Sequence, residues 1–390
     1  MTETCDLCRS SSLAQVYEPS GSRRALKVYL CGQCGLVQSL PRTDRAPRRD
    51  AAVSSGADWG NVRYGKGFRT DACLAVARAH ADFRKPLVGL DVGSNRGSFA
   101  RALLTAAPQI RLTCVEPDER VAKSCAGLER ANLVHARIEE TTLPADHFDI
   151  IHSCHTVEHL ASPRTTFADH WRTLKQGGLL VVDAPNIGLI GTDDVLEEWF
   201  IDKHLYHFSA MTLACLIEAS GFEILAHPNP NDRENLLFAA KKRARPPRSV
   251  KRNPAEAELA RKLVATYGAT RVRNLAALGE VAAEIAGLSP KRVALWGAGR
   301  LFDALVLYGG FDPKTLVALI DTHLKAHVSE RHGVVLKGPE ALAKSDPQVI
   351  VVMSRAFAPE IARIAKNHAP RADIVLYADL IARARMRAAA

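Results

Sequence analysis

The stretch "LVGLDVGSNRGSFARALL" (residues 87–104) decides the fold of this chain. An apolar strand runs up to Asp91, glycines follow as Gly93 and Gly97, and an amphipathic helix begins near Ser98. A glycine at the end of a strand lets the backbone turn sharply and approach a ligand without a side chain in the way. The segment therefore predicts a strand, a ligand-binding turn and a helix in succession.

Similar units follow along residues 65–240. The short aliphatic runs "RLTCVEP", "FDIIHSC" and "GLLVVDAP" alternate there with longer amphipathic segments. Such alternation is typical of an α/β domain in which helices cover both faces of a mostly parallel sheet. We therefore expect a doubly wound, Rossmann-like domain.

The end of the second predicted strand carries an acidic residue. Glu116 lies nineteen residues after Gly97, where a carboxylate can accept hydrogen bonds from both hydroxyls of a ribose. The glycine pattern of dinucleotide-binding turns is not met, because Asn95 stands between Gly93 and Gly97. A ligand with a ribose and a charged amino-acid tail, without a pyrophosphate, fits this turn better.

On these motifs the segment resembles the class I S-adenosylmethionine-dependent methyltransferases over about residues 65–240. "DVGSNRG" (Asp91 to Gly97) is similar to their first motif, "VEP" to the acidic second motif, and "LKQGGLLVVDAPN" to their fifth strand. The resemblance implies an enzyme with S-adenosylmethionine as cofactor. It assigns cofactor contacts to Asp91, Gly93, Asn95, Gly97, Glu116 and Ile138, the last beside the adenine.

The motif "HTVEHL" places His155, Glu158 and His159 close together. Zinc proteases need His-Glu-x-x-His on one helical face, and the order here is His-x-x-Glu-His, which disfavours a metal site of that kind. We expect His155 to line the cofactor pocket, with a hydrogen-bonded structural histidine as the alternative.

Aromatic and histidine side chains gather in "EEWFIDKHLYHFS" (residues 197–209), where a substrate would enter. We predict His204 as the general base, with Tyr206 and His207 beside it, because a histidine titrating near neutral pH can take a proton from an attacking group. The alternative is that "HLYHFS" only packs the next helix onto the sheet. Ser209 should cap that helix and Gly221 should end it.

The first 45 residues hold two Cys-x-x-Cys pairs separated by 22 residues. Two such pairs match a zinc ribbon, in which Cys5, Cys8, Cys31 and Cys34 supply four thiolates to a structural Zn²⁺. A redox pair would more often be single, at a helix start within a βαβ unit.

The order of a cysteine module, the central domain and a third module resembles the three-part methyltransferases of nucleotide-linked deoxysugars. The resemblance implies a sugar-nucleotide acceptor methylated at carbon, oxygen or nitrogen. Those carbon methyltransferases carry Tyr-His-Glu-His ahead of the following helix. Here the corresponding run is Ile201, Asp202, Lys203 and His204, so only the last histidine is kept.

Residues 254–390 are predicted to form a helical segment and a second Rossmann-like domain. "VALWGAGR" again gives a strand and a glycine turn, and Asp321 lies 22 residues after Gly299. A nucleotide-binding domain and a degenerate structural domain both fit, and a hydride-transfer domain fits less well because the third glycine is missing. A second candidate function is therefore a non-catalytic scaffold or nucleotide sensor.

Composition narrows the remaining possibilities. The 390 residues are 47% apolar and 24% charged, which is typical of globular proteins. Most of the net charge of +10 comes from the basic stretch "KKRARPPRSVKR", so residues 241–253 form a linker or a phosphate- or membrane-surface contact. We expect a cytoplasmic protein that acts on a small molecule, without membrane insertion and without a nucleic-acid partner.

Overall fold

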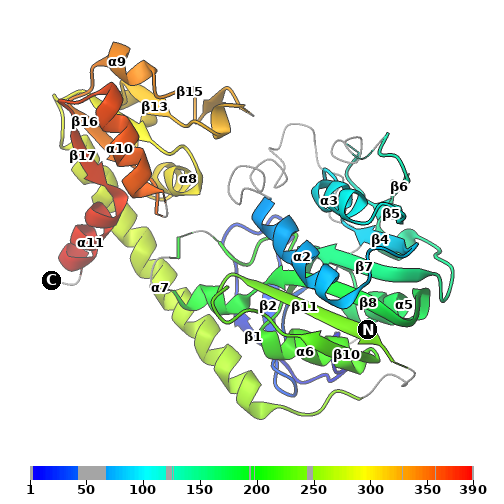
Figure 1. Cartoon of the computed structure of the whole chain (residues 1–390). Coiled ribbons are helices and arrows are strands. Elements are labelled where there is room, and N and C mark those ends of the chain that lie inside the picture. Colours follow the sequence, from blue (N-terminus) through cyan, green and yellow to red (C-terminus); the bar gives the residue numbers. More distant parts are fainter. Residues whose placement is uncertain are drawn as a thin grey trace. The chain divides into compact units, whose positions relative to one another are not determined.

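The chain folds as two compact units, Met1–Gly191 with Phe200–Ala265 and Thr192–Trp199 with Thr266–Ala390. The computed structural model (Figure 1) describes residues 3–42, 67–119, 125, 127–192, 195–196, 198–243, 249–326, 328–355 and 357–388. The middle of the predicted basic linker, residues 244–248, lies outside the described residues. Among the helices of the described residues, none has both the length and the apolar character needed to cross a membrane.

A seven-stranded sheet with the order β10-β11-β8-β7-β4-β5-β6 forms the centre of the first unit. Its strands from β8 to β6 are parallel, and β11 and β10 are antiparallel additions at one edge. The strands are β4 (Val88–Val92), β5 (Arg111–Val115), β6 (Ala131–Val134), β7 (Phe148–Cys154), β8 (Leu174–Pro185), β10 (Phe222–Ala226) and β11 (Asn235–Lys242).

Helices cover both faces of this sheet (Figure 1), because neighbouring residues of a strand point to opposite sides. In β8, Leu179 and Val181 belong to one hydrophobic core, and Leu180 and Val182 belong to the other. The first core includes residues of α2 (Gly67–His80) and α3 (Ser98–Ala106). The second includes residues of α5 (Pro163–Thr173) and α6 (Ala210–Ala219). The predicted α/β fold class is confirmed.

The helix boundaries follow the capping residues in the sequence. Ser209 accepts a hydrogen bond from the backbone N–H of Thr212, whose side chain accepts one from the Ser209 backbone, so α6 begins with a reciprocal capping box. Gly221, at a positive φ of 95°, follows its last turn. Ser162 caps α5, and Pro163 occupies its first turn.

The cysteine module forms a small antiparallel sheet with the order β1-β2-β3-β9. Its own strands are β1 (Leu13–Tyr17), β2 (Lys27–Cys31) and β3 (Val37–Leu40), and the fourth is β9 (Tyr206–His207) from the central domain. Buried residues of the module, Leu26 and Leu36 among them, lie in the same hydrophobic core as α5 and α6. The module is therefore packed onto the central domain by both a core and a sheet.

The second unit has its own six-stranded sheet, with the order β14-β15-β13-β12-β16-β17. All its strand pairs are parallel except β14 with β15. The strands are β12 (Val293–Trp296), β13 (Ala318–Ile320), β14 (Glu330–Arg331), β15 (Val334–Lys337), β16 (Val349–Val352) and β17 (Asp373–Leu376). The longer helices are α7 (Pro254–Ala286), which spans the division between the units, α8 (Arg300–Leu307), α10 (Ala358–His368) and α11 (Tyr377–Ala388); α9 (Ala341–Ser345) is short.

Candidate functional site

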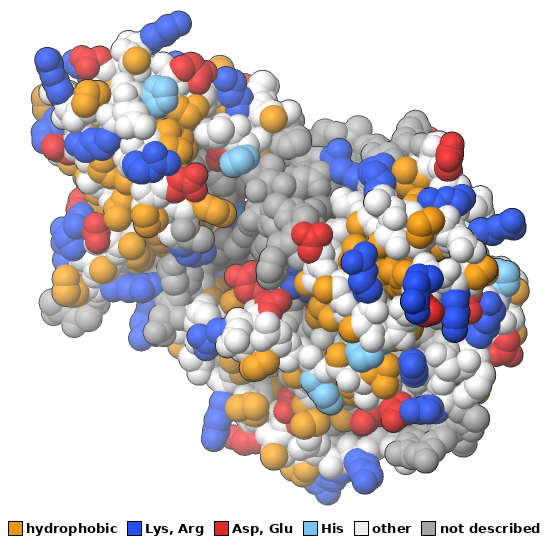
Figure 2. Space-filling model, viewed as in Figure 1, with side chains coloured by type: hydrophobic (Ala, Val, Ile, Leu, Met, Phe, Trp, Pro, Cys, Tyr) orange, Lys and Arg blue, Asp and Glu red, His pale blue; other side chains and the backbone are white. Residues whose placement is uncertain are grey.

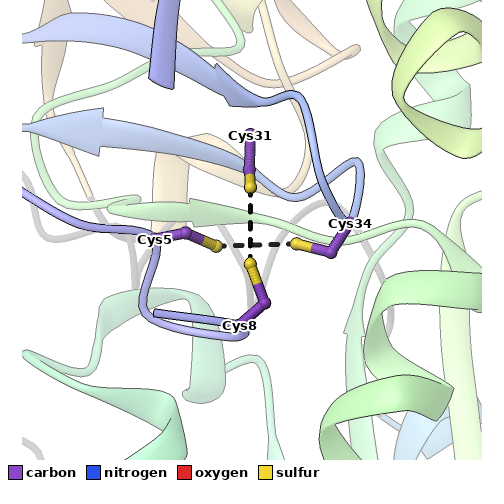
Figure 3. A group of neighbouring side chains, drawn as sticks. All are labelled: Cys5, Cys8, Cys31 and Cys34. Atoms are coloured by element: carbon purple, nitrogen blue, oxygen red, sulfur yellow. Dashed lines mark hydrogen bonds between the residues drawn. The ribbon is translucent and has the colours of Figure 1, made fainter. Parts of the chain in front are cut away.

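The four cysteines of the module point toward one centre (Figure 3). The Sγ atoms of Cys5 and Cys34 are 3.5 Å apart, as are those of Cys8 and Cys31. All four sulfur atoms lie within 4.8 Å of one another. In a tetrahedral zinc site with Zn–S bonds of about 2.3 Å, the sulfurs are about 3.8 Å apart. The donor set therefore fits a four-coordinate Zn²⁺.

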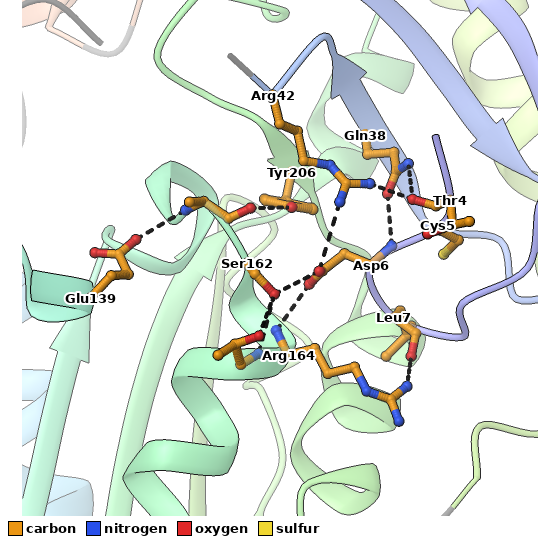
Figure 4. A network of polar contacts seen from close by, with 12 residues as sticks. Thr4, Cys5, Asp6, Leu7, Gln38, Arg42, Glu139, Ser162, Arg164 and Tyr206 are labelled. Atoms are coloured by element: carbon orange, nitrogen blue, oxygen red, sulfur yellow. Dashed lines mark hydrogen bonds and ion pairs between the residues drawn. The ribbon is translucent and has the colours of Figure 1, made fainter. Parts of the chain in front are cut away.

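Asp6, next to the first cysteine, ties the module to the start of α5 (Figure 4). Its buried carboxylate accepts a hydrogen bond from Ser162 Oγ at 2.7 Å and one from the Arg164 backbone N–H at 2.9 Å. The Arg42 guanidinium lies 3.8 Å from the same carboxylate. A carboxylate at the first turn of a helix satisfies free N–H groups and is favoured by the helix dipole.

The module also holds the segment that carries the predicted catalytic residues. The Asp202 carboxylate accepts hydrogen bonds from the Ser22 hydroxyl and from the Arg23 backbone N–H. Gln38 of β3 pairs with Tyr206 of β9, and the backbone N–H of the next residue, Ser39, donates to the Leu205 carbonyl at 2.8 Å. Residues 202–207 are thus fixed from outside the central domain.

The predicted cofactor turn lies at the carboxyl end of β4. The N–H groups of Gly93 and Ser94 both donate to the Val115 carbonyl, which anchors the turn to β5. Gly93 has a φ of +71°, and a Cβ there would collide with Thr156 Oγ1. Gly97 has a φ of +76°, and a Cβ there would lie 2.7 Å from Cys125 Sγ. Both positions therefore require glycine, as the sequence predicted.

Glu116 follows β5 at the same edge and is 7% exposed. Its Oε2 accepts from the Asn95 N–H at 2.8 Å, and its Oε1 accepts from the Asp118 N–H at 2.9 Å. Burial raises the pKa of this carboxyl above its usual value. Because a carboxylate oxygen has two acceptor positions, each oxygen keeps one for a ribose hydroxyl.

Asp91 lies beneath the turn and is buried. Its Oδ1 lies 2.7 Å from His152 Nδ1, and the His152 ring stacks on Phe99 at a centroid distance of 3.5 Å. Among the described residues, Asp91 Oδ2 has no hydrogen-bond partner. Ile138, buried in the short turn after β6, lies at the far edge. The structure thus gathers Asp91, Gly93, Asn95, Gly97 and Glu116 at adjoining strand ends.

His155 follows β7 and contacts the neighbouring strands β8 and β11. Its backbone N–H donates to the Asp183 carbonyl of β8, and its Nε2 lies 2.9 Å from Oδ1 of Asn235 in β11. The predicted contact of His155 with the cofactor stays a prediction.

The three predicted catalytic side chains have different surroundings. His207 is buried, 3.0 Å from Ser39 Oγ, and burial lowers its pKa to about 3. The Tyr206 hydroxyl donates to the Ala161 carbonyl at 2.8 Å, and burial raises its pKa above the usual range. Only His204 lies beside a polar cluster, with its ring centroid 4.8 Å from that of His159. Burial lowers its pKa well below the usual value.

Glu158, which the sequence indicated only as part of a disfavoured metal motif, is buried at this edge of the sheet. It is 2% exposed and lies between His155 and His159 in the turn η3 (Val157–His159). Burial raises its pKa to about 7. The spacing in "HTVEHL" showed that Glu158 is close to two histidines in the sequence. It could not show that the carboxyl group is buried.

Comparisons with known proteins identify the central domain. Residues 64–227 match the family model described as a methyltransferase domain. No curated protein matches the chain. Among solved structures, an S-adenosylmethionine-dependent methyltransferase from Mesorhizobium loti is similar, with 17% identity and a TM-score of 0.37, over 44% of this chain and 100% of the other. A methyltransferase from Aquifex aeolicus is also similar, with 13% identity and a TM-score of 0.39, over 48% of this chain and 98% of the other.

The match of residues 64–227 confirms the prediction of a methyltransferase domain in the centre of the chain. The turn at Gly93 and the carboxylate of Glu116 fit S-adenosylmethionine as the cofactor, because they offer close backbone approach and free acceptor positions for a ribose. When bound, S-adenosylmethionine supplies an electrophilic methyl group on a sulfonium.

Proposed function

We propose that this enzyme methylates a small polar acceptor derived from a sugar, in the simplest case a nucleotide-linked sugar. The observation that carries the proposal is that the cysteine module forms hydrogen bonds with residues 202–207, at Asp202, Leu205 and His207. These hydrogen bonds hold the segment with the predicted catalytic residues in one position. A fixed position of this kind is what binding of a defined small molecule requires.

On the face drawn in Figure 2, the charge distribution supports a small acceptor rather than a polynucleotide. Figure 2 shows Lys and Arg side chains spread over the visible face with Asp and Glu among them, instead of gathered in one stripe. A protein that tracks a phosphate backbone needs a continuous basic surface.

We also propose that Cys5, Cys8, Cys31 and Cys34 hold a structural Zn²⁺. The mutual distances of their sulfur atoms fit tetrahedral coordination, and the short strands β1 to β3 bury little surface of their own. Thiolates remain available in a reducing compartment, which agrees with a cytoplasmic location.

In the second unit taken by itself, Asp321 supports a nucleotide-binding role for that unit. Its Oδ2 accepts from the Ala298 N–H at 3.0 Å, and its Oδ1 accepts from the Leu324 N–H at 2.8 Å. Asp321 Oδ1 also accepts from the His323 N–H at 3.1 Å, so Oδ2 is the oxygen that keeps an acceptor position for a ribose hydroxyl, whereas in Glu116 both oxygens keep one.

The test is methyl transfer from labelled S-adenosylmethionine to a panel of nucleotide sugars, free sugars and small RNA. We expect label in one or more nucleotide sugars, and the position of the methyl group identifies the acceptor atom. Label found only in RNA would refute the proposal.

A binding measurement separates the cofactor from the acceptor. Glu116→Ala should weaken S-adenosylmethionine binding by roughly tenfold to a hundredfold, because two hydrogen bonds to the ribose are lost, each contributing about 1 kcal/mol. Asp321→Ala should leave S-adenosylmethionine binding unchanged and weaken binding of a nucleotide by the second unit.

A further inference from the structure

Glu158 is enclosed without the partners that a buried carboxylate needs. It is 2% exposed, and among the described residues neither of its carboxylate oxygens has a hydrogen-bond partner. Leaving a buried charge without compensation is costly, so such a group is normally paired, hydrogen-bonded or bound to a metal. The groups that face it indicate which of these applies.

His159 presents a nitrogen lone pair to this carboxylate. Its Nδ1 lies 2.8 Å from the Lys203 carbonyl oxygen. Because a carbonyl only accepts, the ring proton is on Nδ1, and Nε2 of the neutral ring carries the lone pair. That Nε2 lies 3.6 Å from Glu158 Oε1, too far for a hydrogen bond.

His155 also directs a ring nitrogen toward the Glu158 carboxylate. Its Nε2 lies 2.9 Å from Asn235 Oδ1, and the Asn235 amide nitrogen donates to Asp232, so the Asn235 oxygen faces the ring. His155 therefore donates through Nε2, and its Nδ1 lone pair lies 3.9 Å from Glu158 Oε1. Ring nitrogens of two histidines thus face one buried carboxylate at 3.6–3.9 Å, beyond hydrogen-bond distance.

His204 completes the cluster from a distant part of the sequence. One ligand atom each from Glu158, His159 and His204 lies within 4.8 Å of the others. In octahedral coordination with bonds of about 2.1 Å, neighbouring donors are about 3 Å apart and opposite donors about 4.2 Å apart. The 3.6 Å between His159 Nε2 and Glu158 Oε1 lies within that range, and the 4.8 Å limit for all three atoms is close to it.

We propose that Glu158, His159 and His204 bind a divalent transition-metal cation. One carboxylate and two imidazoles are a donor set for such ions, and the Lys203 carbonyl supplies the outer hydrogen bond that orients a ligating histidine. His159 and His204 are both half-buried, so the site keeps an open side. An open coordination position suits an oxygen atom of the acceptor.

The spacing argument against a metal at "HTVEHL" does not apply to this arrangement. That argument assumed an α-helix, whereas Val157–His159 form a 3₁₀ turn and the third ligand comes from the segment held by Asp202. The proposal also changes the role of His204 from general base to metal ligand. It does not depend on which acceptor the enzyme methylates.

The test uses Co²⁺ with the full chain, after Zn²⁺ has filled the cysteine site. We expect one Co²⁺ per chain, with visible d–d absorption and without the sulfur-to-cobalt charge-transfer band of a thiolate site. Glu158→Gln and His159→Gln should each weaken Co²⁺ binding at least about tenfold. Neither methyl donor nor acceptor is present, so the result is independent of the proposed function.

A control and a third site variant keep the test decisive. His170→Gln removes a buried histidine of α5 outside the cluster, and it should bind Co²⁺ like the wild type. His204→Ala changes a half-buried residue, so it reports on the site if Glu158→Gln does not fold. Absence of a nitrogen–oxygen Co²⁺ site in the wild type, or unchanged binding in all three site variants, would overturn the proposal.

Discussion

At the scale of a single residue, Gly93 shows how closely the backbone of the cofactor turn packs against Thr156. It has a φ of +71°, and a Cβ would meet Thr156 Oγ1. We expect Gly93→Ala to lower the free energy of unfolding by about 1–2 kcal/mol, the cost of a left-handed conformation for a residue with a Cβ. S-adenosylmethionine binding should weaken as well, because the methyl group displaces Thr156 at the turn.

Gly177→Ala is the matched control for that substitution. Gly177 has a φ of +75°, and a Cβ there would meet nothing within 4 Å. It should cause a similar loss of stability in chemical denaturation and leave the cofactor dissociation constant unchanged. If both variants bound the cofactor as the wild type does, the assigned role of the Gly93 turn would be wrong.

His170 gives a prediction about pH. It is 1% exposed, and burial lowers its pKa to about 4. The unfolded chain takes up the proton at about pH 6.5 and the native protein only near pH 4. Stability from this residue is therefore present above pH 6.5 and is lost as the pH falls toward 4, by about 3 kcal/mol in total.

Denaturation of His170→Gln between pH 7 and pH 4 measures that contribution. The variant should lose less stability over this interval than the wild type, even if it is less stable at pH 7. His135→Gln, which changes an exposed histidine, should follow the wild type. If the free energy of unfolding fell equally with pH in the wild type and in His170→Gln, burial would not be keeping the His170 ring neutral.

At the scale of the elements, Asp202 positions the segment that carries His204. Asp202→Ala removes the acceptor for the Ser22 hydroxyl and the Arg23 N–H. Residues 202–205 then lose two of the hydrogen bonds that hold them to the cysteine module. We expect kcat to fall about tenfold, because a small misplacement of a site residue is costly. The dissociation constant for S-adenosylmethionine should not change, since the cofactor turn lies at the ends of β4 and β5.

Asp202→Asn should recover part of the lost rate, because its amide oxygen can still accept one of the two hydrogen bonds. Asp82→Ala, at a loop residue that pairs with the nearby Arg84 and Lys85, serves as the control. A fall in cofactor affinity equal to the fall in kcat would instead indicate general loss of folding.

The sequence predicted those elements whose signals are local. The strand ending at Asp91, the turn at Gly93 and the cap at Ser209 each follow from neighbouring residues. The pairing of β3 with β9 joins Val37 to His207, and no local pattern reports a partner so far along the chain. For the same reason the sequence could not show that Tyr206 and His207 would be enclosed by the cysteine module.

Glu158 illustrates the limit for the site. Its neighbours in "HTVEHL" were visible, but His204 arrives through the tertiary fold, and the proton positions on His155 and His159 depend on Asn235 and Lys203. Spacing rules assume one regular element, and this cluster combines a 3₁₀ turn with a loop. Burial of the carboxyl is a property of the packed chain alone.

At the scale of the whole molecule, the cysteine module is coupled to the stability of the first unit. Cys5, Cys31 and Cys34 belong to the same hydrophobic core as α5 and α6, and Asp6 caps α5. Binding of a structural zinc contributes roughly 10 kcal/mol or more to folding of the segment that holds it. Loss of the metal should therefore disturb the catalytic domain and not only the module.

Cys31→Ser tests this coupling, because it removes one of the four proposed ligands at a fully buried position. We expect zinc content by elemental analysis to fall from one per chain to well below one. The melting temperature of the first unit should fall together with kcat, because residues 202–207 lose the sheet that holds them. Cys215→Ser, at a half-buried cysteine of α6 outside the cluster, should keep its zinc and its activity. A Cys31→Ser protein without zinc that retained wild-type kcat and melting temperature would show that the module is only an attachment to the catalytic domain.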